Sequence, residues 1–84
     1  MEQFETGMMA RSKSGHDAGK VYVITKVEEA YVYLVDGKVR TLYKPKKKKK
    51  KHVQLIKESF DIQGATNVDI KRWIKIWNKE DNQN

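Results

Sequence analysis

The alternation of apolar and polar residues predicts short β-strands over the first two thirds of the chain. Residues 20–27 (KVYVITKV) and 31–35 (YVYLV) are rich in β-branched and aromatic residues, which favour strands. Residues 8–12 (MMARS) and 52–56 (HVQLI) are shorter segments, and each is also predicted to form a strand.

Two turn signals separate these strands. The Asp36-Gly37 pair favours a two-residue β-hairpin and predicts a further strand over 38–43 (KVRTLY), with Val39 and Leu42 facing inward. A second turn is predicted at 14–19, where two glycines flank an aspartate and favour a backbone with positive φ. Five short strands joined by small turns predict a mainly β fold, a strongly bent barrel formed by one closed antiparallel sheet.

The apolar period changes near the C-terminal end to that of an amphipathic helix. Residues on one stripe follow the spacing i, i+3, i+4, i+7: Ile70, Trp73, Ile74 and Trp77. They predict a helix over about 67–79, and residues 66–69 (TNVD) approximate a capping box with Asp in place of Glu. We expect the two tryptophans to hold this helix against the barrel; the alternative is that they form a surface for a partner.

Length and composition indicate one small domain. The chain has 84 residues, so it can bury one modest core. We expect a flexible lead-in at 1–6, a single domain at 7–80 with its barrel at 7–56, and a frayed tail at 81–84. Cysteine is absent, no apolar run is long enough to span a membrane, and the first residues are acidic and polar. These features predict a soluble, cytoplasmic protein that does not bind membranes.

The excess positive charge is confined to one segment. The formal net charge is +7, yet residues 1–43 carry six basic and six acidic side chains, and residues 53–84 carry five of each. The whole excess therefore comes from Lys44 and the run of lysines at 46–51. Seven ammonium groups in eight positions repel one another unless water, counterions or a polyanion surround them. We predict an exposed basic loop at 44–51: either a solubilising loop or, as we favour, a phosphate-binding arm.

The sequence offers little for catalysis. It has no phosphate-loop, dinucleotide-binding or HExxH motif. Its two histidines, His16 and His52, lie in basic surroundings and are too few for a metal site. Paired carboxylates fall in a predicted turn or tail, where nothing would raise their pKa for acid–base work. We therefore expect neither an enzyme nor a cofactor.

A binding module fits these residues better. The glycine turn can bring backbone N–H groups close to a phosphate, because glycine has no Cβ to block the approach. Four tyrosines are candidate platforms for stacking bases, although half-buried packing in the barrel is the simpler interpretation: Tyr22, Tyr31, Tyr33 and Tyr43. The candidate RNA-binding residues are Arg11, Lys13, Ser14, Gly15, His16, Gly19, Lys20, Arg40, Lys44, Lys46, Lys47, Lys48, Lys49, Lys50, Lys51 and His52.

The segment from Gly7 to Ile24 resembles a KOW motif, a basic turn with a fixed glycine between two β-segments, and Gly19 matches that glycine. The resemblance continues through VITKVEEAYVYLVDG, the basic segment, HVQLI and 61–65 (DIQGA). Over residues 7–78 the chain is similar to the large-subunit ribosomal protein family of archaea and eukaryotes numbered fourteen in the eukaryotic series, and to its small bacterial relatives.

This resemblance implies an SH3-like barrel with a C-terminal helix that binds ribosomal RNA in the large subunit. Outside that ribonucleoprotein we expect a monomer. Phosphate contacts should supply affinity with little sequence specificity. Two alternatives remain: a protein-interaction adaptor that uses the barrel to bind an acidic partner, and a transcription-elongation role, which a KOW motif also permits.

Overall fold

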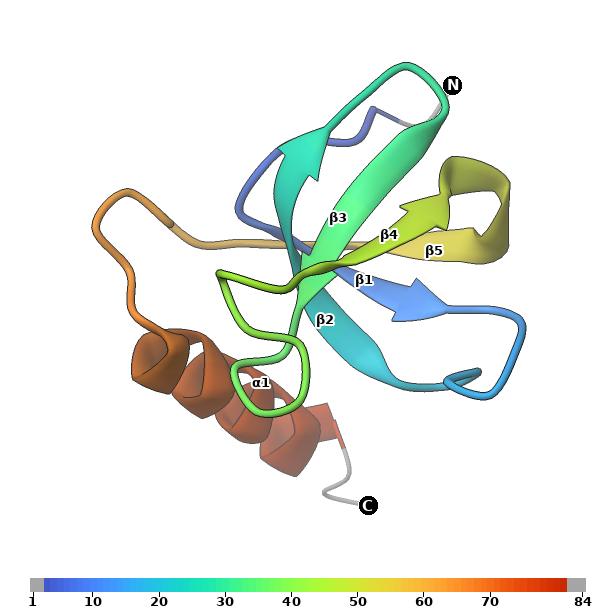
Figure 1. Cartoon of the computed structure of the whole chain (residues 1–84). Helices are drawn as coiled ribbons and strands as arrows, with labels where there is room; N and C mark the ends of the chain where they lie inside the picture. Colours follow the sequence, from blue (N-terminus) through green and yellow to red (C-terminus); the bar gives the residue numbers. More distant parts are fainter. Residues whose placement is uncertain (1–2, 82–84) are drawn as a thin grey trace.

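The computed structural model describes the backbone of residues 3–81, which form a five-stranded antiparallel sheet and a C-terminal helix (Figure 1). The tail expected at 81–84 therefore lies almost entirely outside the described residues. The elements in chain order are β1 (Met8–Ser12), β2 (Val21–Val27), β3 (Tyr31–Val35), β4 (Lys46–Lys49), the short 3-10 helix η1 (Lys50–His52), β5 (Val53–Ser59) and α1 (Asn67–Asp81).

The sheet is strongly bent but not closed. Its strand order is β4-β3-β2-β1-β5, and every neighbouring pair is antiparallel. The order leaves β4 and β5 as the two edges, separated along the chain by η1, whose Lys50 N–H donates to the carbonyl oxygen of Ala30. The mainly β, SH3-like fold with a C-terminal helix is confirmed, whereas the expected closure into one continuous sheet is wrong.

The fourth strand is not the predicted one. Residues 38–43 form no strand, and Val39 and Tyr43 are 78% and 93% exposed. The Asp36 carboxylate accepts hydrogen bonds from the backbone N–H groups of Lys38 (2.8 Å) and Arg40 (2.9 Å), which folds the chain into a local turn. The strand next to β3 is instead Lys46–Lys49, within the segment 44–51 that was predicted to be a loop.

The β3–β4 loop is held against the first turn of α1. Gly37 has φ +81°, and a Cβ at this position would clash with the carbonyl oxygen of Asn67. Further along the loop, the backbone N–H of Leu42 donates to Oδ1 of Asn67 at 2.8 Å. These contacts explain the failed hairpin prediction, because they draw the loop toward the helix and away from β3.

The two faces of the sheet bury separate apolar clusters. Inside the bend lie Ala10, Tyr22, Ile24, Val32, Leu34 and Val53. Under α1 lie Met9, Val21, Val23 and Val35, and Ile70 of the helix packs onto them. Burial on both faces explains the nearly continuous apolar run in β2. Phe4, within the lead-in expected at 1–6, packs against the first cluster.

The helix begins and docks as predicted. The N–H of Thr66 donates to Oδ2 of Asp69 (3.0 Å), and the N–H of Asp69 donates to Oγ1 of Thr66 (3.2 Å), which is a reciprocal capping box. The Thr66 backbone N–H bond is the main cause that lowers the pKa of Asp69. Trp73 stacks on Phe60 with ring centroids 4.7 Å apart, and Trp77 also packs against the cluster under α1.

Candidate nucleic-acid interface

The turn between β1 and β2 is closed by its own backbone. Gly19 N–H donates to the carbonyl oxygen of Ser12 (2.8 Å), Ala18 N–H to that of Gly15 (3.2 Å) and Lys20 N–H to that of Asp17 (3.0 Å). The three N–H groups at the end of the turn are therefore used internally and cannot cradle a phosphate. Among residues 3–81, four successive N–H groups of the turn have no intramolecular acceptor and can be offered to a ligand: Ser14, Gly15, His16 and Asp17.

The lysines of β4 alternate between the two faces of the sheet. Lys47 and Lys49 are opposite Tyr33 and Tyr31 in the β3–β4 ladder, on the outer face. Lys46 and Lys48 are opposite the fully buried Leu34 and Val32, on the inner face. An inward lysine is tolerated only where its aliphatic stem covers apolar surface and its ammonium group finds a polar partner.

Asp17 is that partner. Its Oδ1 lies 3.0 Å from Nζ of Lys48 and its Oδ2 lies 3.2 Å from Nζ of Lys46. The hydroxyl groups of Ser12 and Tyr22 donate to the same carboxylate at 2.8 and 3.1 Å. The Asp17 side chain is only 8% exposed, and that of Lys48 only 10%. A network with four donors on one carboxylate thus joins β4 to the β1–β2 turn.

This network fixes the charge state of Asp17. Burial by itself raises the pKa of a carboxyl group, but hydrogen bonds from Lys48, Ser12, Lys46 and Tyr22 outweigh that effect and hold the pKa of Asp17 well below its usual range. In turn, burial and the neighbouring Asp17 charge raise the pKa of Tyr22 to about 12. Tyr22 is 3% exposed, so it is not available to stack on a base, unlike the partly exposed Tyr31 and Tyr33.

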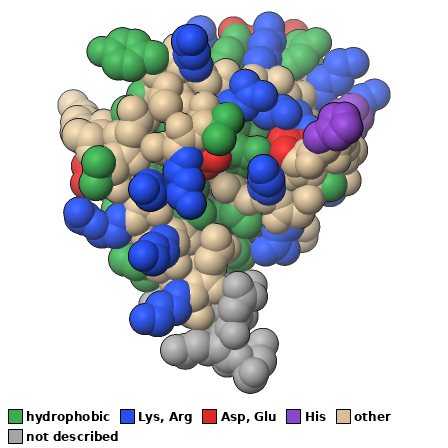
Figure 2. All heavy atoms as spheres, turned by 60° about the horizontal axis from the view of Figure 1, so that its bottom comes forward, with side chains coloured by type: hydrophobic (Ala, Val, Ile, Leu, Met, Phe, Trp, Pro, Cys, Tyr) green, Lys and Arg blue, Asp and Glu red, His purple; other side chains and the backbone are tan. Residues whose placement is uncertain are grey.

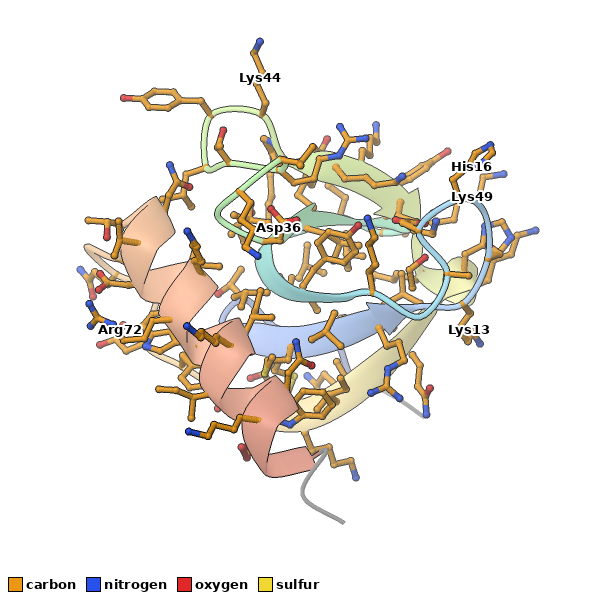
Figure 3. All side chains as sticks on the ribbon, turned by 90° about the horizontal axis from the view of Figure 1, so that it is seen from below. Lys13, His16, Asp36, Lys44, Lys49 and Arg72 are labelled. Carbon is orange, nitrogen blue, oxygen red and sulfur yellow. The ribbon has the colours of Figure 1, made fainter. Side chains whose placement is uncertain are left out.

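The fold brings the turn and the lysine segment together, although more than thirty positions separate them. Nζ of Lys48 donates to the carbonyl oxygen of Ser14 at 2.9 Å, and the N–H of Lys13 donates to that of His52 at 2.9 Å. Figure 3 shows Lys13, His16 and Lys49 at one end of the molecule. We call this surface the basic end: Lys13, Gly15, His16, Lys49, Lys51 and His52.

Other predicted residues lie elsewhere. The guanidinium of Arg11 lies 5.4 Å from the ring centroid of Trp77 in α1. Lys44 is exposed in the β3–β4 loop and projects away from the basic end (Figure 3). Arg40 is held in the same loop, where its backbone N–H donates to Asp36. The sixteen candidates therefore do not form one contiguous site.

The remaining lysines of the segment have aromatic or acidic neighbours. Nζ of Lys47 lies 4.5 Å from the ring centroid of Tyr31 and 3.8 Å from a carboxylate oxygen of Glu28. Nζ of Lys50 lies 5.5 Å from the ring centroid of Phe4. These three contacts contribute little to stability, so the two ammonium groups can exchange them for a phosphate at small cost.

Asp17 is the residue that the sequence interpretation missed. Its pattern predicts only a turn, because an aspartate between glycines favours tight turns. One signal was present: Asp17 is the only acidic residue between Arg11 and Lys26, and a lone acid in a basic stretch suggests an ion pair.

Within residues 3–81 no group of three or more His, Asp or Glu side chains is arranged to hold a metal ion. The helix α1 is not long and apolar enough to cross a membrane. No protein-family model matches the chain, and no curated protein matches it.

Proposed function

We propose that this protein binds RNA through the basic end and that it acts in association with ribosomal RNA, as its resemblance to KOW proteins implies. The observation that carries the proposal is the convergence of the glycine turn and the lysine segment. Two regions with exposed cationic side chains come from distant parts of the chain and meet at one end of a small domain. Such a concentration of ammonium groups binds a polyanion by releasing its condensed counterions.

The basic end supplies two kinds of contact. Lys13, Lys49 and Lys51 are exposed and provide the electrostatic attraction. The N–H groups of Gly15 and His16, two of those without an intramolecular acceptor, can donate to a phosphate oxygen. None of these groups reads a base edge, so recognition depends on RNA shape more than on sequence.

The salt dependence of RNA binding tests the proposal. The variant K13Q/K49Q/K51Q removes three charges from the basic end, and the control K57Q/R72Q/K79Q removes three exposed charges elsewhere. For a duplex RNA, log Kd against log salt should have a slope lower by about 2 to 3 in the first variant and by less than about 1 in the control. Equal slopes, or no RNA binding by the unmodified protein, would contradict the proposal.

Sedimentation separates the ribosomal role from its alternatives. A ribosome-associated protein should co-sediment with the large subunit at low salt and be released at high salt, with the K13Q/K49Q/K51Q variant released earlier. Capture by RNA polymerase without co-sedimentation would instead support the transcription-elongation role.

A further inference from the structure

A second basic site lies beside the basic end, in a groove between α1, the β3–β4 loop and the last residues of the glycine turn. The groove has a volume of about 550 Å³. Figure 2 shows many Lys and Arg side chains and few Asp or Glu side chains on the face turned toward the viewer, and Figure 3 shows Asp36 between the helix and the turn.

Four lysines surround this groove, and each comes from an exposed position: Lys20, Lys38, Lys71 and Lys75. Within the described part of the chain, none of the four forms an ion pair with an acidic side chain. The one acidic residue in the lining, Asp36, uses Oδ1 to accept two backbone N–H groups of its own loop. The groove thus has an excess of three positive charges. This excess requires an anionic occupant or a layer of counterions.

The walls between the lysines are apolar. Val39 is 78% exposed at the mouth of the groove, and Ile74 is half-buried on the helix side. A simple inorganic anion would leave these aliphatic surfaces in water. A ligand with both phosphates and a flat apolar part matches the two components of the lining, and an unpaired nucleotide has both.

The arrangement of the lysines fits a nucleic-acid strand. Lys71 and Lys75 are four residues apart on α1, so their side chains emerge about 5 to 6 Å apart on one face, close to the spacing of successive phosphates along a strand. Gly19 and Lys20 belong both to the glycine turn and to the groove lining, so the path from the basic end is continuous. A groove of about 550 Å³ has the volume of a small-ligand site, so it can take unpaired nucleotides but cannot enclose a duplex.

We propose that the groove holds an unpaired segment of the RNA whose folded part lies on the basic end. The inference rests on the proposed function and adds three lysines that the sequence pattern did not assign to binding: Lys38, Lys71 and Lys75. In this arrangement Lys71 and Lys75 contact phosphates, and Val39 and Ile74 contact a base or ribose. The protein therefore prefers RNA at a junction between duplex and single strand.

Two RNA probes test this preference by fluorescence anisotropy: a blunt duplex, and the same duplex with a short single-stranded oligouridine extension. The extension should increase the affinity of the unmodified protein about tenfold. K71Q/K75Q should reduce that gain to less than about twofold and leave duplex binding unchanged. The control K57Q/R72Q removes two charges, one of them on α1 but outside the groove, and should retain the tenfold gain.

A photo-crosslink gives an independent readout. With thiouridine in the extension, cross-linked peptides should contain Val39 or residues 71–78. Duplex binding without any gain from the extension, or a gain that K71Q/K75Q retains, overturns this inference and leaves the proposed function standing. Failure of the unmodified protein to bind either probe overturns both. Thermal unfolding of each variant shows whether a loss of affinity reflects a loss of folded protein.

Discussion

Nζ of Lys48 lies 3.0 Å from Oδ1 of Asp17 and 2.9 Å from the carbonyl oxygen of Ser14, in a position where the lysine side chain is only 10% exposed. A residue from the middle of a six-lysine run is thus part of the folded interior. The finding divides the run into two groups with different roles. Lys46 and Lys48 connect the edge strand β4 to the β1–β2 turn, whereas Lys49 and Lys51 remain exposed for binding.

Asp17→Asn should destabilise the protein by about 3 kcal/mol, because it leaves two inward ammonium groups without their counter-charge. The pKa of Asp17 is lower in the folded state than in the unfolded state. The contribution of Asp17 to the free energy of unfolding is therefore fully present above about pH 4, and it is lost as the pH falls through the pKa of the folded state. Urea unfolding as a function of pH should show the unmodified protein approaching the stability of the variant in acid. If the free energies of unfolding of the unmodified protein and of Asp17→Asn differed by the same amount at every pH, the low pKa of Asp17 would be contradicted.

Lys48→Met and Lys49→Met form a matched pair that separates structure from binding. Lys48→Met removes the hydrogen bonds to Asp17 and Ser14 and should cost about 2 kcal/mol of stability. Lys49→Met changes an exposed side chain and should alter stability by less than about 0.5 kcal/mol. In RNA titrations the larger effect should come from the other variant: only Lys49→Met should lower the slope of log Kd against log salt, by about 1. If one variant had the larger effect on both stability and the salt dependence of RNA binding, the β4 lysines would not alternate between an inward structural role and an outward binding role.

Tyr22 should lose its proton at unusually high pH. Burial and the Asp17 charge raise its pKa to about 12. The stability that the neutral phenol contributes is thus present below about pH 10, the usual value, and is lost as the pH rises through about 12. A spectrophotometric titration of tyrosinate should contain a late transition that Tyr22→Phe removes. Asp17→Asn should shift that transition to lower pH, and an unshifted transition would rule out the proposed coupling.

Gly37→Ala and Gly64→Ala separate backbone strain from close packing. Both glycines have positive φ, +81° and +76°, so alanine introduces strain of roughly 1 kcal/mol at either position. At Gly64 the added Cβ meets no atom within 4 Å, whereas at Gly37 it clashes with the backbone of Asn67. We expect Gly37→Ala to cost about 1 to 3 kcal/mol more than Gly64→Ala in chemical unfolding. Equal costs would mean that the β3–β4 loop does not press against α1.

The local sequence was enough to predict the strands and the helix whose apolar side chains recur with a regular period or whose first turn has capping residues. The β-branched residues of β2 and β3 and the Thr66–Asp69 box specify local structure that packing then reinforces. The Ile70 and Trp73 stripe predicted a docked helix in the same way, because an apolar face must be buried wherever the chain places it.

Long-range contacts, and not the local sequence, select the segment that forms the fourth strand and the lysines that point inward. A run of identical residues has no hydrophobic period, so its register and its two faces cannot be predicted from its own pattern. They depend on Asp17, some thirty positions earlier, and on Asn67 and Gly37, which draw the β3–β4 loop to the helix. Local propensity favoured residues 38–43, but the long-range contacts of Asp17, Asn67 and Gly37 outweighed it.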